Sequence, residues 1–72
     1  MRTEDYMGMI EEYCREKEKY GVKRIFTLRW LMGVFNIPKD EKMKLLYAIK
    51  RLHAEGKIKK RGSKAWEWNG NN

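Results

Sequence analysis

The stretch Asp40–Glu55 constrains the fold more than any other part of the chain, because helical spacing separates its apolar side chains from its cationic ones. One face carries the apolar residues Leu45, Ala48, Ile49 and Leu52, with Leu46 on the flank. At 100° per residue, the opposite side carries Met43, Tyr47, Lys50 and Arg51, flanked by Lys39, Lys42 and Lys44. Gly56 ends the helix, and its start is open between Pro38, as a first-turn proline, and Asp40, as a cap. We therefore expect a two-sided helix over residues 39–55. Its sixteen residues from Asp40 to Glu55 would span about 24 Å.

A second helix is predicted just before it, over Thr27–Phe35, with Thr27 as its cap. Its core face carries Leu28, Leu31, Met32 and Phe35. On the other side, packing of Trp30 and Val34 against a preceding helix is favoured, and an exposed Trp30 at a subunit contact is the alternative. The intervening residues Asn36–Lys39 include an asparagine suited to the left-handed conformation and a proline whose predecessor avoids helical geometry. The two helices are thus expected to meet at a compact turn.

Two basic segments, Lys57–Arg61 and Lys64–Trp68, are predicted to form a β-hairpin around a Gly-Ser pair. A two-residue turn would pair Ile58 with Glu67 and place a carboxylate beside the one apolar residue of the first strand. A three-residue loop that begins at Arg61 pairs Ile58 with Trp66 and sends three apolar side chains to the core, those of Ile58, Trp66 and Trp68. Because a one-residue slip exchanges the faces of a strand, burial favours the odd-length loop or an equivalent bulge.

Residues 3–20 form the first predicted helix, with Thr3 as its cap and Gly21 as its end. One face carries Tyr6, Met9, Ile10, Tyr13, Lys17 and Tyr20, and the outer face is rich in acidic side chains. This helix is expected to support the core or to form a homodimer contact. A short strand over 22–26 can then pair with the hairpin, and residues 69–72 are expected to fray.

The charge of the chain is distributed unevenly, and the distribution favours a polyanion as partner. The formal net charge is +7. Residues 1–20 hold four basic and six acidic side chains, hence −2, whereas residues 21–72 hold thirteen basic and four acidic ones, hence +9. Such an asymmetry predicts one face for a polyanion and another for a different contact, the alternative being a basic solvated surface. The absence of Gln and the abundance of Lys, Glu and Arg are typical of a heat-adapted protein.

Length and composition exclude several classes of function. Seventy-two residues make a single small domain, 1–72, with a thin core and no room for a catalytic domain. No apolar run approaches the roughly 20 residues of a membrane span, and no secretory pattern is present, so a cytoplasmic location is expected. One Cys, Cys14, and one His, His53, provide neither a disulfide nor a four-ligand zinc site. We expect no enzymatic activity and no cofactor, because no nucleophile, phosphate loop or metal cluster is indicated.

Three segments of the chain resemble the winged helix-turn-helix superfamily. They are TLRWLMGVFNIPKD over 27–40, KRLHAEGKI over 50–58 and the Lys/Arg-Gly-Ser hairpin. The resemblance covers Val22–Trp68, and the passage from KRL through EGKI into the hairpin is its most typical part. It implies an α+β winged-helix fold of three helices, a short strand and a C-terminal hairpin. Small free-standing members, common in archaea and their plasmids and viruses, are mostly double-stranded DNA-binding transcriptional regulators and often dimeric. For this chain, a homodimer through the first helix is expected.

Within such a protein the helix over 39–55 would enter the major groove, where side chains contact base edges. The candidates for base contact are Met43, Tyr47, Lys50 and, as a further possibility, Arg51. The candidates for backbone contact are Lys39, Lys42, Lys44, Lys59, Lys60, Arg61 and Lys64, the last two at the hairpin tip. Asp40 and Glu41 depart from the superfamily pattern, because small polar or basic residues are more usual near phosphate.

Two other functions remain open at the level of sequence. A protein-interaction subunit of a replication or transcription assembly would use exposed Trp30, Met43 or Tyr47 as apolar anchors. A binder of RNA or single strands would use Trp66 and Trp68 as stacking platforms, although the expected register of the hairpin buries both rings. DNA binding predicts an affinity that falls steeply with salt, which the first alternative does not.

Overall fold

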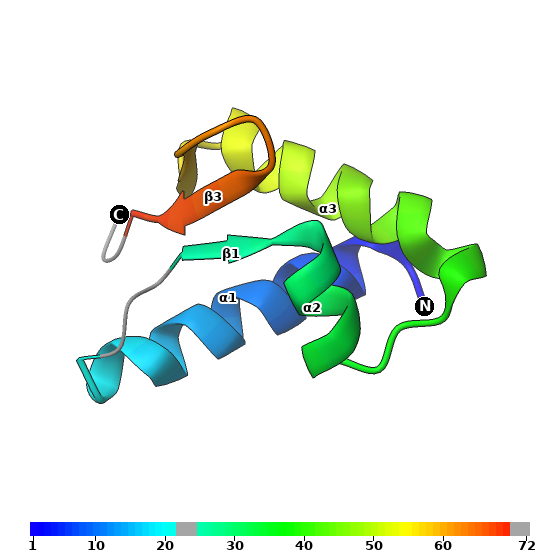
Figure 1. Cartoon of the computed structure of the whole chain (residues 1–72), viewed down its shortest axis with the longest axis horizontal. Helices are drawn as coiled ribbons and strands as arrows, with labels where there is room; N and C mark the ends of the chain where they lie inside the picture. The colour runs from blue at the N-terminus through cyan, green and yellow to red at the C-terminus, as the bar shows by residue number, and fades with distance from the viewer. Residues whose placement is uncertain (22–24, 70–72) are drawn as a thin grey trace.

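Helices and short strands alternate along the chain in an α+β arrangement. A computed structural model describes residues 1–21 and 25–69 (Figure 1). Within these ranges the elements are α1 (Thr3–Lys19), β1 (Ile25–Thr27), α2 (Leu28–Val34), a 3-10 turn η1 (Lys39–Glu41), α3 (Lys42–Ala54), β2 (Ile58–Lys60) and β3 (Ala65–Trp68). Three α-helices and a small three-stranded antiparallel sheet result, in an order compatible with a winged-helix layout.

The sheet has the order β1-β3-β2, so the last strand in sequence lies in the middle. Ile58 pairs with Trp68 and Lys60 with Trp66, so the expected pairing of Ile58 with Trp66 is wrong. The loop still spans three residues, Gly62–Lys64, and it is closed by a 2.9 Å hydrogen bond from Arg61 N–H to the Ala65 carbonyl. Partners shift by two positions, which preserves the faces: Ile58 and Trp68 are buried, while Trp66 is half-buried beside the core. This register places the largest buried ring opposite the one apolar side chain of β2.

Strand β1 passes into α2 without a linker, because Thr27 is both the last strand residue and the helix cap. Its Oγ1 accepts a 3.0 Å hydrogen bond from Trp30 N–H, as its position predicted. The strand begins at Ile25, and the expected strand residues 22–24 lie outside the described residues. In α1 the N-terminal cap is Arg2 rather than the predicted Thr3. The Asp5 carboxylate accepts a 2.9 Å hydrogen bond from Arg2 N–H, so Thr3 is the first residue of the helix.

The two-sided helix is shorter than its sequence pattern suggested. Pro38 is followed by the single 3-10 turn η1, and the α-helix begins only at Lys42. Its thirteen residues therefore span about 20 Å. Asn36 has a φ of 58° and Gly56 a φ of 77°, so each takes the left-handed conformation expected at its helix end.

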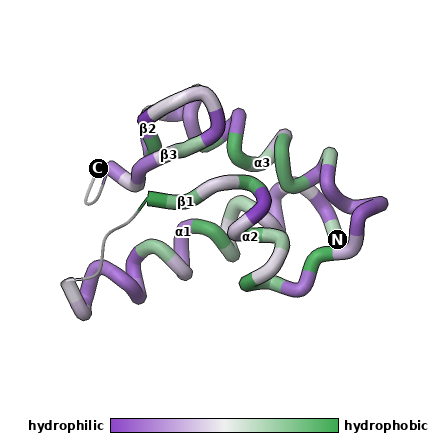
Figure 2. The backbone as a smooth tube through the Cα atoms, viewed as in Figure 1, coloured by the Kyte–Doolittle hydropathy of each residue, from purple (hydrophilic) through white to green (hydrophobic). Residues whose placement is uncertain are grey.

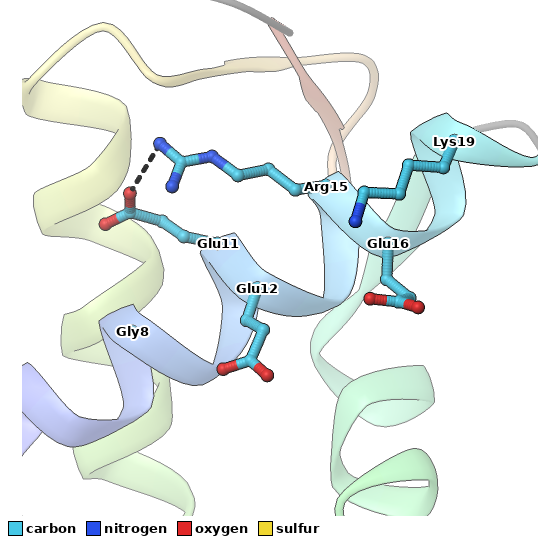
Figure 3. A pocket seen from close by; sticks show the side chains of 6 residues that line it. All are labelled: Gly8, Glu11, Glu12, Arg15, Glu16 and Lys19. Carbon is cyan, nitrogen blue, oxygen red and sulfur yellow. Dashed lines mark hydrogen bonds and ion pairs between the residues drawn. The ribbon is translucent and has the colours of Figure 1, made fainter.

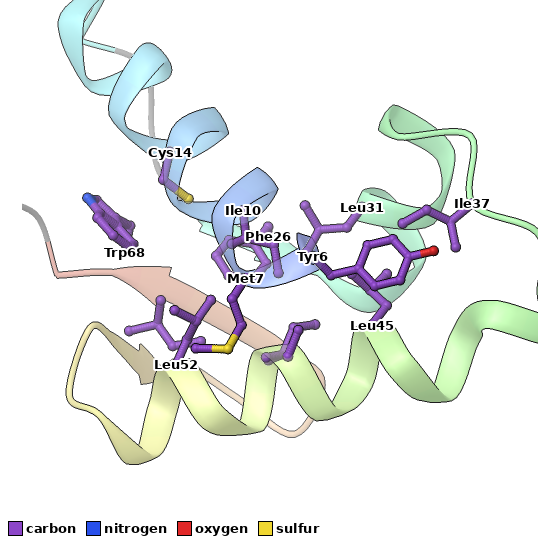
Figure 4. Close-up of a cluster of buried hydrophobic side chains, with 13 residues drawn as sticks. Tyr6, Met7, Ile10, Cys14, Phe26, Leu31, Ile37, Leu45, Leu52 and Trp68 are labelled. Atoms are coloured by element: carbon purple, nitrogen blue, oxygen red, sulfur yellow. The ribbon is translucent and has the colours of Figure 1, made fainter. Parts of the chain in front are cut away.

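The core lies between α1, α3 and the sheet (Figure 4). The predicted inward face of α3 is confirmed, because Leu45, Ala48, Ile49 and Leu52 are all completely buried. Helix α1 is rotated relative to its predicted face: its buried side chains are Tyr6, Met7, Ile10 and Cys14. Tyr13 is consequently half-buried and Tyr20 is 75% exposed. The rotation brings Met7 and Cys14 into the core in place of Met9 and Tyr13, and it leaves Tyr20, the residue that follows α1, at the surface.

Candidate nucleic-acid interface

The outward side of α3 is open to solvent. Met43 and Tyr47 are each 52% exposed, and Lys50 and Arg51 are exposed beside them. This side is open because α1 and the sheet cover only the Leu45–Leu52 face, and the tube of α3 alternates between hydrophobic and hydrophilic segments (Figure 2). All four residues proposed for base contact are thus accessible.

Acidic side chains of α1 and η1 neutralise the cations on one flank of α3. Arg51 Nη1 lies 3.3 Å from the Glu4 carboxylate of α1. Lys44 Nζ lies 3.1 Å from Glu41, three residues earlier in the chain. Just beyond α3, Lys57 Nζ lies 3.3 Å from Glu11 of α1. Charge on this flank is therefore compensated within the protein, and the flank attracts a polyanion weakly.

The opposite flank of α3 faces the hairpin and keeps its positive charge. Helical spacing places Lys42, Lys50 and His53 on this flank. The His53 ring meets the Trp66 ring edge-on, with centroids 5.2 Å apart, and Lys60 Nζ lies 5.5 Å from the centroid of the same indole. Within the described residues, Lys42 and Lys50 have no ion pair. Trp66 thus joins His53 of α3 to Lys60 of the hairpin, on the same side of α3 as Lys42 and Lys50.

At the tip of the hairpin, the cations Arg61 and Lys64 differ in their surroundings. Arg61 Nε lies 3.1 Å from Glu67, which is also the register partner of Lys59 on the neighbouring strand. Lys64 is exposed in the loop and has no ion pair within the described part of the chain. The outer face of the sheet is therefore partly neutralised by one carboxylate, whereas the loop retains a free ammonium group.

The eleven side chains proposed from sequence as DNA contacts are all exposed, but the structure divides the nine cations among them. Three are paired with carboxylates: Lys44, Arg51 and Arg61. The other six have no ion pair among residues 1–21 and 25–69: Lys39, Lys42, Lys50, Lys59, Lys60 and Lys64. Sequence reasoning missed the carboxylates that make this division and the place of His53 and Trp66 beside Lys60. Partners such as Glu4 and Arg51 lie 47 residues apart and leave no local signal.

The Glu41 carboxylate is bound by other side chains of the protein. Its Oε1 accepts a 2.7 Å hydrogen bond from the buried Tyr6 hydroxyl, in addition to the contact with Lys44. The Tyr6 hydrogen bond is the main cause that lowers the pKa of Glu41 from 4.5 to about 2. The same hydrogen bond, together with burial, raises the pKa of Tyr6 to about 12. The carboxylate therefore fixes the start of α3 to α1 and contributes little free negative charge.

A shallow hollow of about 530 Å³ lies over the outer face of α1 (Figure 3). Its lining comes from this helix alone: Gly8, Glu11, Glu12, Arg15, Glu16 and Lys19. Its open, mixed-charge lining does not provide the enclosed apolar walls of a small-molecule site. Among the described residues, no group of three or more His, Cys, Asp or Glu side chains could hold a metal ion, and no helix is long and apolar enough to cross a membrane.

A scan against protein-family models, a search of curated proteins and a search of solved structures each found no match to this chain. The function is therefore inferred from the geometry and charge of the surface itself.

Proposed function

We propose that this chain is a winged-helix protein that binds double-stranded DNA and regulates transcription, and that it acts by binding rather than by catalysis. In this proposal α3 enters the major groove and the hairpin lies on the adjacent backbone. A helix of about 20 Å is long enough to cross a groove about 12 Å wide. A cytoplasmic, nucleoid-associated location is part of the same proposal.

The observation that carries the proposal is the open outward side of α3. Tyr47 and Met43 are half exposed there beside Lys50, while the residues on the inner side of the same helix are completely buried. An exposed aromatic ring, a thioether and an ammonium group can contact base edges and thymine methyl groups. No segment among the described residues covers them, so a duplex could approach without a rearrangement of the chain.

The distribution of charge supports a docking position shifted toward the hairpin. Lys42 and Lys50 on α3 and Lys60 and Lys64 on the hairpin are free of ion pairs within the described residues. The flank of α3 nearer α1 is compensated by acidic groups. Phosphates are therefore attracted most strongly to the space between α3 and the hairpin. We infer that Lys42, Lys60 and Lys64 contact the backbone, that Tyr47 contacts bases, and that Lys50 contacts both a base edge and an adjacent phosphate.

Binding of the purified chain to a random pool of labelled duplexes, followed by selection and sequencing, tests this proposal. Variants Lys50→Ala and Tyr47→Ala should alter the preferred sequence, whereas Lys64→Ala should weaken binding to all sequences alike. Lys19→Ala serves as a matched control, because it removes an exposed positive charge from α1, away from α3. An equal loss on every sequence for all three test variants would leave a sequence-independent DNA binder and refute the specific regulator.

A second function is favoured by the chemistry of two of the same residues. Met43 and Tyr47 are exposed apolar groups on one helix face, as are the anchors of many protein interfaces. The chain would then be an interaction subunit of a replication or transcription assembly. Absence of salt-sensitive binding to duplex DNA near physiological ionic strength would support this function over DNA binding.

A further inference from the structure

An apolar surface on the side of α1 that faces α2 remains open to solvent. We name it the seam patch and define it by Met9, Tyr13, Trp30, Val34 and Phe35. Trp30 is 56% exposed and Val34 is 42% exposed, one helical turn apart on α2. Tyr13 of α1 joins them, because its hydroxyl accepts a 3.0 Å hydrogen bond from Trp30 Nε1 and its ring meets Phe35 at 5.6 Å. The favoured expectation that Trp30 packs against the first helix is thus only partly met. Its Nε1 atom is bound to Tyr13 of α1, but more than half of the side chain is exposed to solvent.

The seam patch lies on the other side of α1 from the residues that contact α3 and the hairpin segment. Glu11, which pairs with Lys57 of the hairpin segment, and Tyr13, which binds Trp30, are two residues apart and so about 200° apart around the helix. A molecule bound to the seam patch would therefore leave the outward side of α3 accessible. The two surfaces can be occupied at the same time.

Gly33 lies on the exposed side of α2, and no contact within the single chain requires a glycine at this position. Nothing lies within 4 Å of the position that a Cβ would occupy, and its φ is not in the left-handed region. A glycine inside a helix destabilises it relative to alanine. Beside the exposed indole of Trp30, a bare stretch of backbone allows close approach of another helix, as small residues do at helix contacts. On this short helix Gly33 thus provides a recess, and Trp30 provides a projecting side chain that could fill the same recess on another copy of the helix.

The charges around the seam patch favour a second copy of the chain as the partner. Lys17, whose Nζ lies 5.5 Å from the Tyr13 ring, and Arg29 are cationic, whereas Glu12 and Glu16 on α1 are anionic. A rim with both signs can complement itself under two-fold symmetry. Duplex DNA or a uniformly acidic protein would meet Glu12 and Glu16, and a uniformly basic protein would meet Lys17 and Arg29. Moreover, the two positive and two negative side chains of this rim sum to zero in a chain of +7, so two copies repel each other less here than at the cationic hairpin.

We propose that the seam patch is a homodimer interface in which Trp30 of each chain packs on α2 of a second copy near Gly33. The proposal moves the dimer contact expected for α1 toward α2 and is independent of DNA binding. A standard interface covers about 800 Å² per partner, roughly a sixth of the chain's 5074 Å². The seam patch therefore has to be supplemented by the charged rim.

Sedimentation equilibrium of the whole chain, without DNA and over a range of concentrations, tests this interface. We expect a monomer–dimer equilibrium that Trp30→Glu weakens at least about tenfold. Tyr47→Glu is the matched control, because Tyr47 is 52% exposed on α3 and should leave the equilibrium unchanged. Circular dichroism of each variant verifies that the fold is retained. A chain that stays monomeric at hundreds of micromolar, or a dimer insensitive to Trp30→Glu, would overturn the proposal.

A second pair of variants separates dimerisation from folding. Gly33→Ala and Gly8→Ala each add a methyl group to a helix position with open space around it. Both should raise the thermal midpoint of the monomer, because alanine is the better helix former. Only Gly33→Ala should weaken the dimer. Equal dimer strength in the two variants would contradict the placement of Trp30 over Gly33.

Discussion

Two neighbouring cations of α3, Lys50 and Arg51, are expected to contribute very differently to DNA binding. Both are exposed, and each alanine substitution removes one positive charge. However, Arg51 is already paired with Glu4 at 3.3 Å, whereas Lys50 faces the hairpin without an ion pair among the described residues. Lys50→Ala should therefore remove a phosphate or base contact, while Arg51→Ala should mainly remove a contact between α3 and α1. Glu4→Gln is the third variant, because it releases Arg51 for DNA.

The salt dependence of binding gives the size of these effects. If Lys42, Lys50, Lys60 and Lys64 each neutralise one phosphate, the slope of log K against log salt is about −3.6. Affinity then falls about 150-fold between 50 and 200 mM salt. Without Lys50 the slope becomes about −2.7 and the fall about 40-fold. Arg51→Ala should leave the slope unchanged, and Glu4→Gln should make it steeper by at most about 0.9.

Fluorescence anisotropy of a labelled duplex, titrated with each variant at four or more salt concentrations, provides the slopes. The comparison is internal, because the variants share one duplex and one buffer series. Equal reductions of the slope by Lys50→Ala and Arg51→Ala would show that the Glu4–Arg51 pair does not hold in solution. A Glu4→Gln slope indistinguishable from that of the unaltered chain would refute the division of charge on which the docking position depends.

Three further expectations concern stability. Ile49→Val removes one methyl group from a completely buried side chain and should destabilise the fold by about 0.5–1.5 kcal/mol in urea denaturation; no loss would mean that α3 does not pack as described. Thr27→Ala removes the oxygen that accepts from Trp30 N–H and should cost about 1 kcal/mol by the same assay, with Thr27→Ser as the control that retains it. Tyr6→Phe removes the hydrogen bond to Glu41. Because the pKa of Glu41 is lowered to about 2, its contribution to the stability of the fold is complete above about pH 4.5 and is lost as the pH falls toward 2. Because the pKa of Tyr6 is raised to about 12, its contribution to stability is complete below about pH 10 and is lost as the pH rises toward 12. Thermal melts across pH should show smaller changes in both windows for Tyr6→Phe, and unchanged profiles would contradict the hydrogen bond.

Sequence was sufficient for the features that depend on local spacing. The period of Leu45, Ala48, Ile49 and Leu52 gave the buried face of α3, and the glycine after Glu55 gave its end. Hydroxyl capping at Thr27 was also predictable, because a cap acts within three residues of the helix start. These features need no knowledge of the distant parts of the chain.

Features that depend on contacts between distant parts of the chain could not be predicted from local spacing. The hairpin register followed from a parity argument that fixes the faces but allows a shift by two, and the burial of Trp68 against the core decides between the registers. The rotation of α1 is set by how its side chains meet α3, which periodicity alone does not define. The same holds for the pairing of Glu4 with Arg51 and of Glu41 with Tyr6, because each joins α1 to residues more than thirty positions away.

The central position of β3 has a consequence for the order in which the protein can fold during synthesis. β1 and β2 hydrogen-bond only to β3 in the described sheet, so neither has a strand partner until Ala65–Trp68 have left the ribosome. Helices can form while the chain is still being made, but the sheet and the burial of Trp68 have to wait for translation to pass this strand. A nascent chain stalled before Ala65 should accordingly remain sensitive to protease even though its helices have been synthesised.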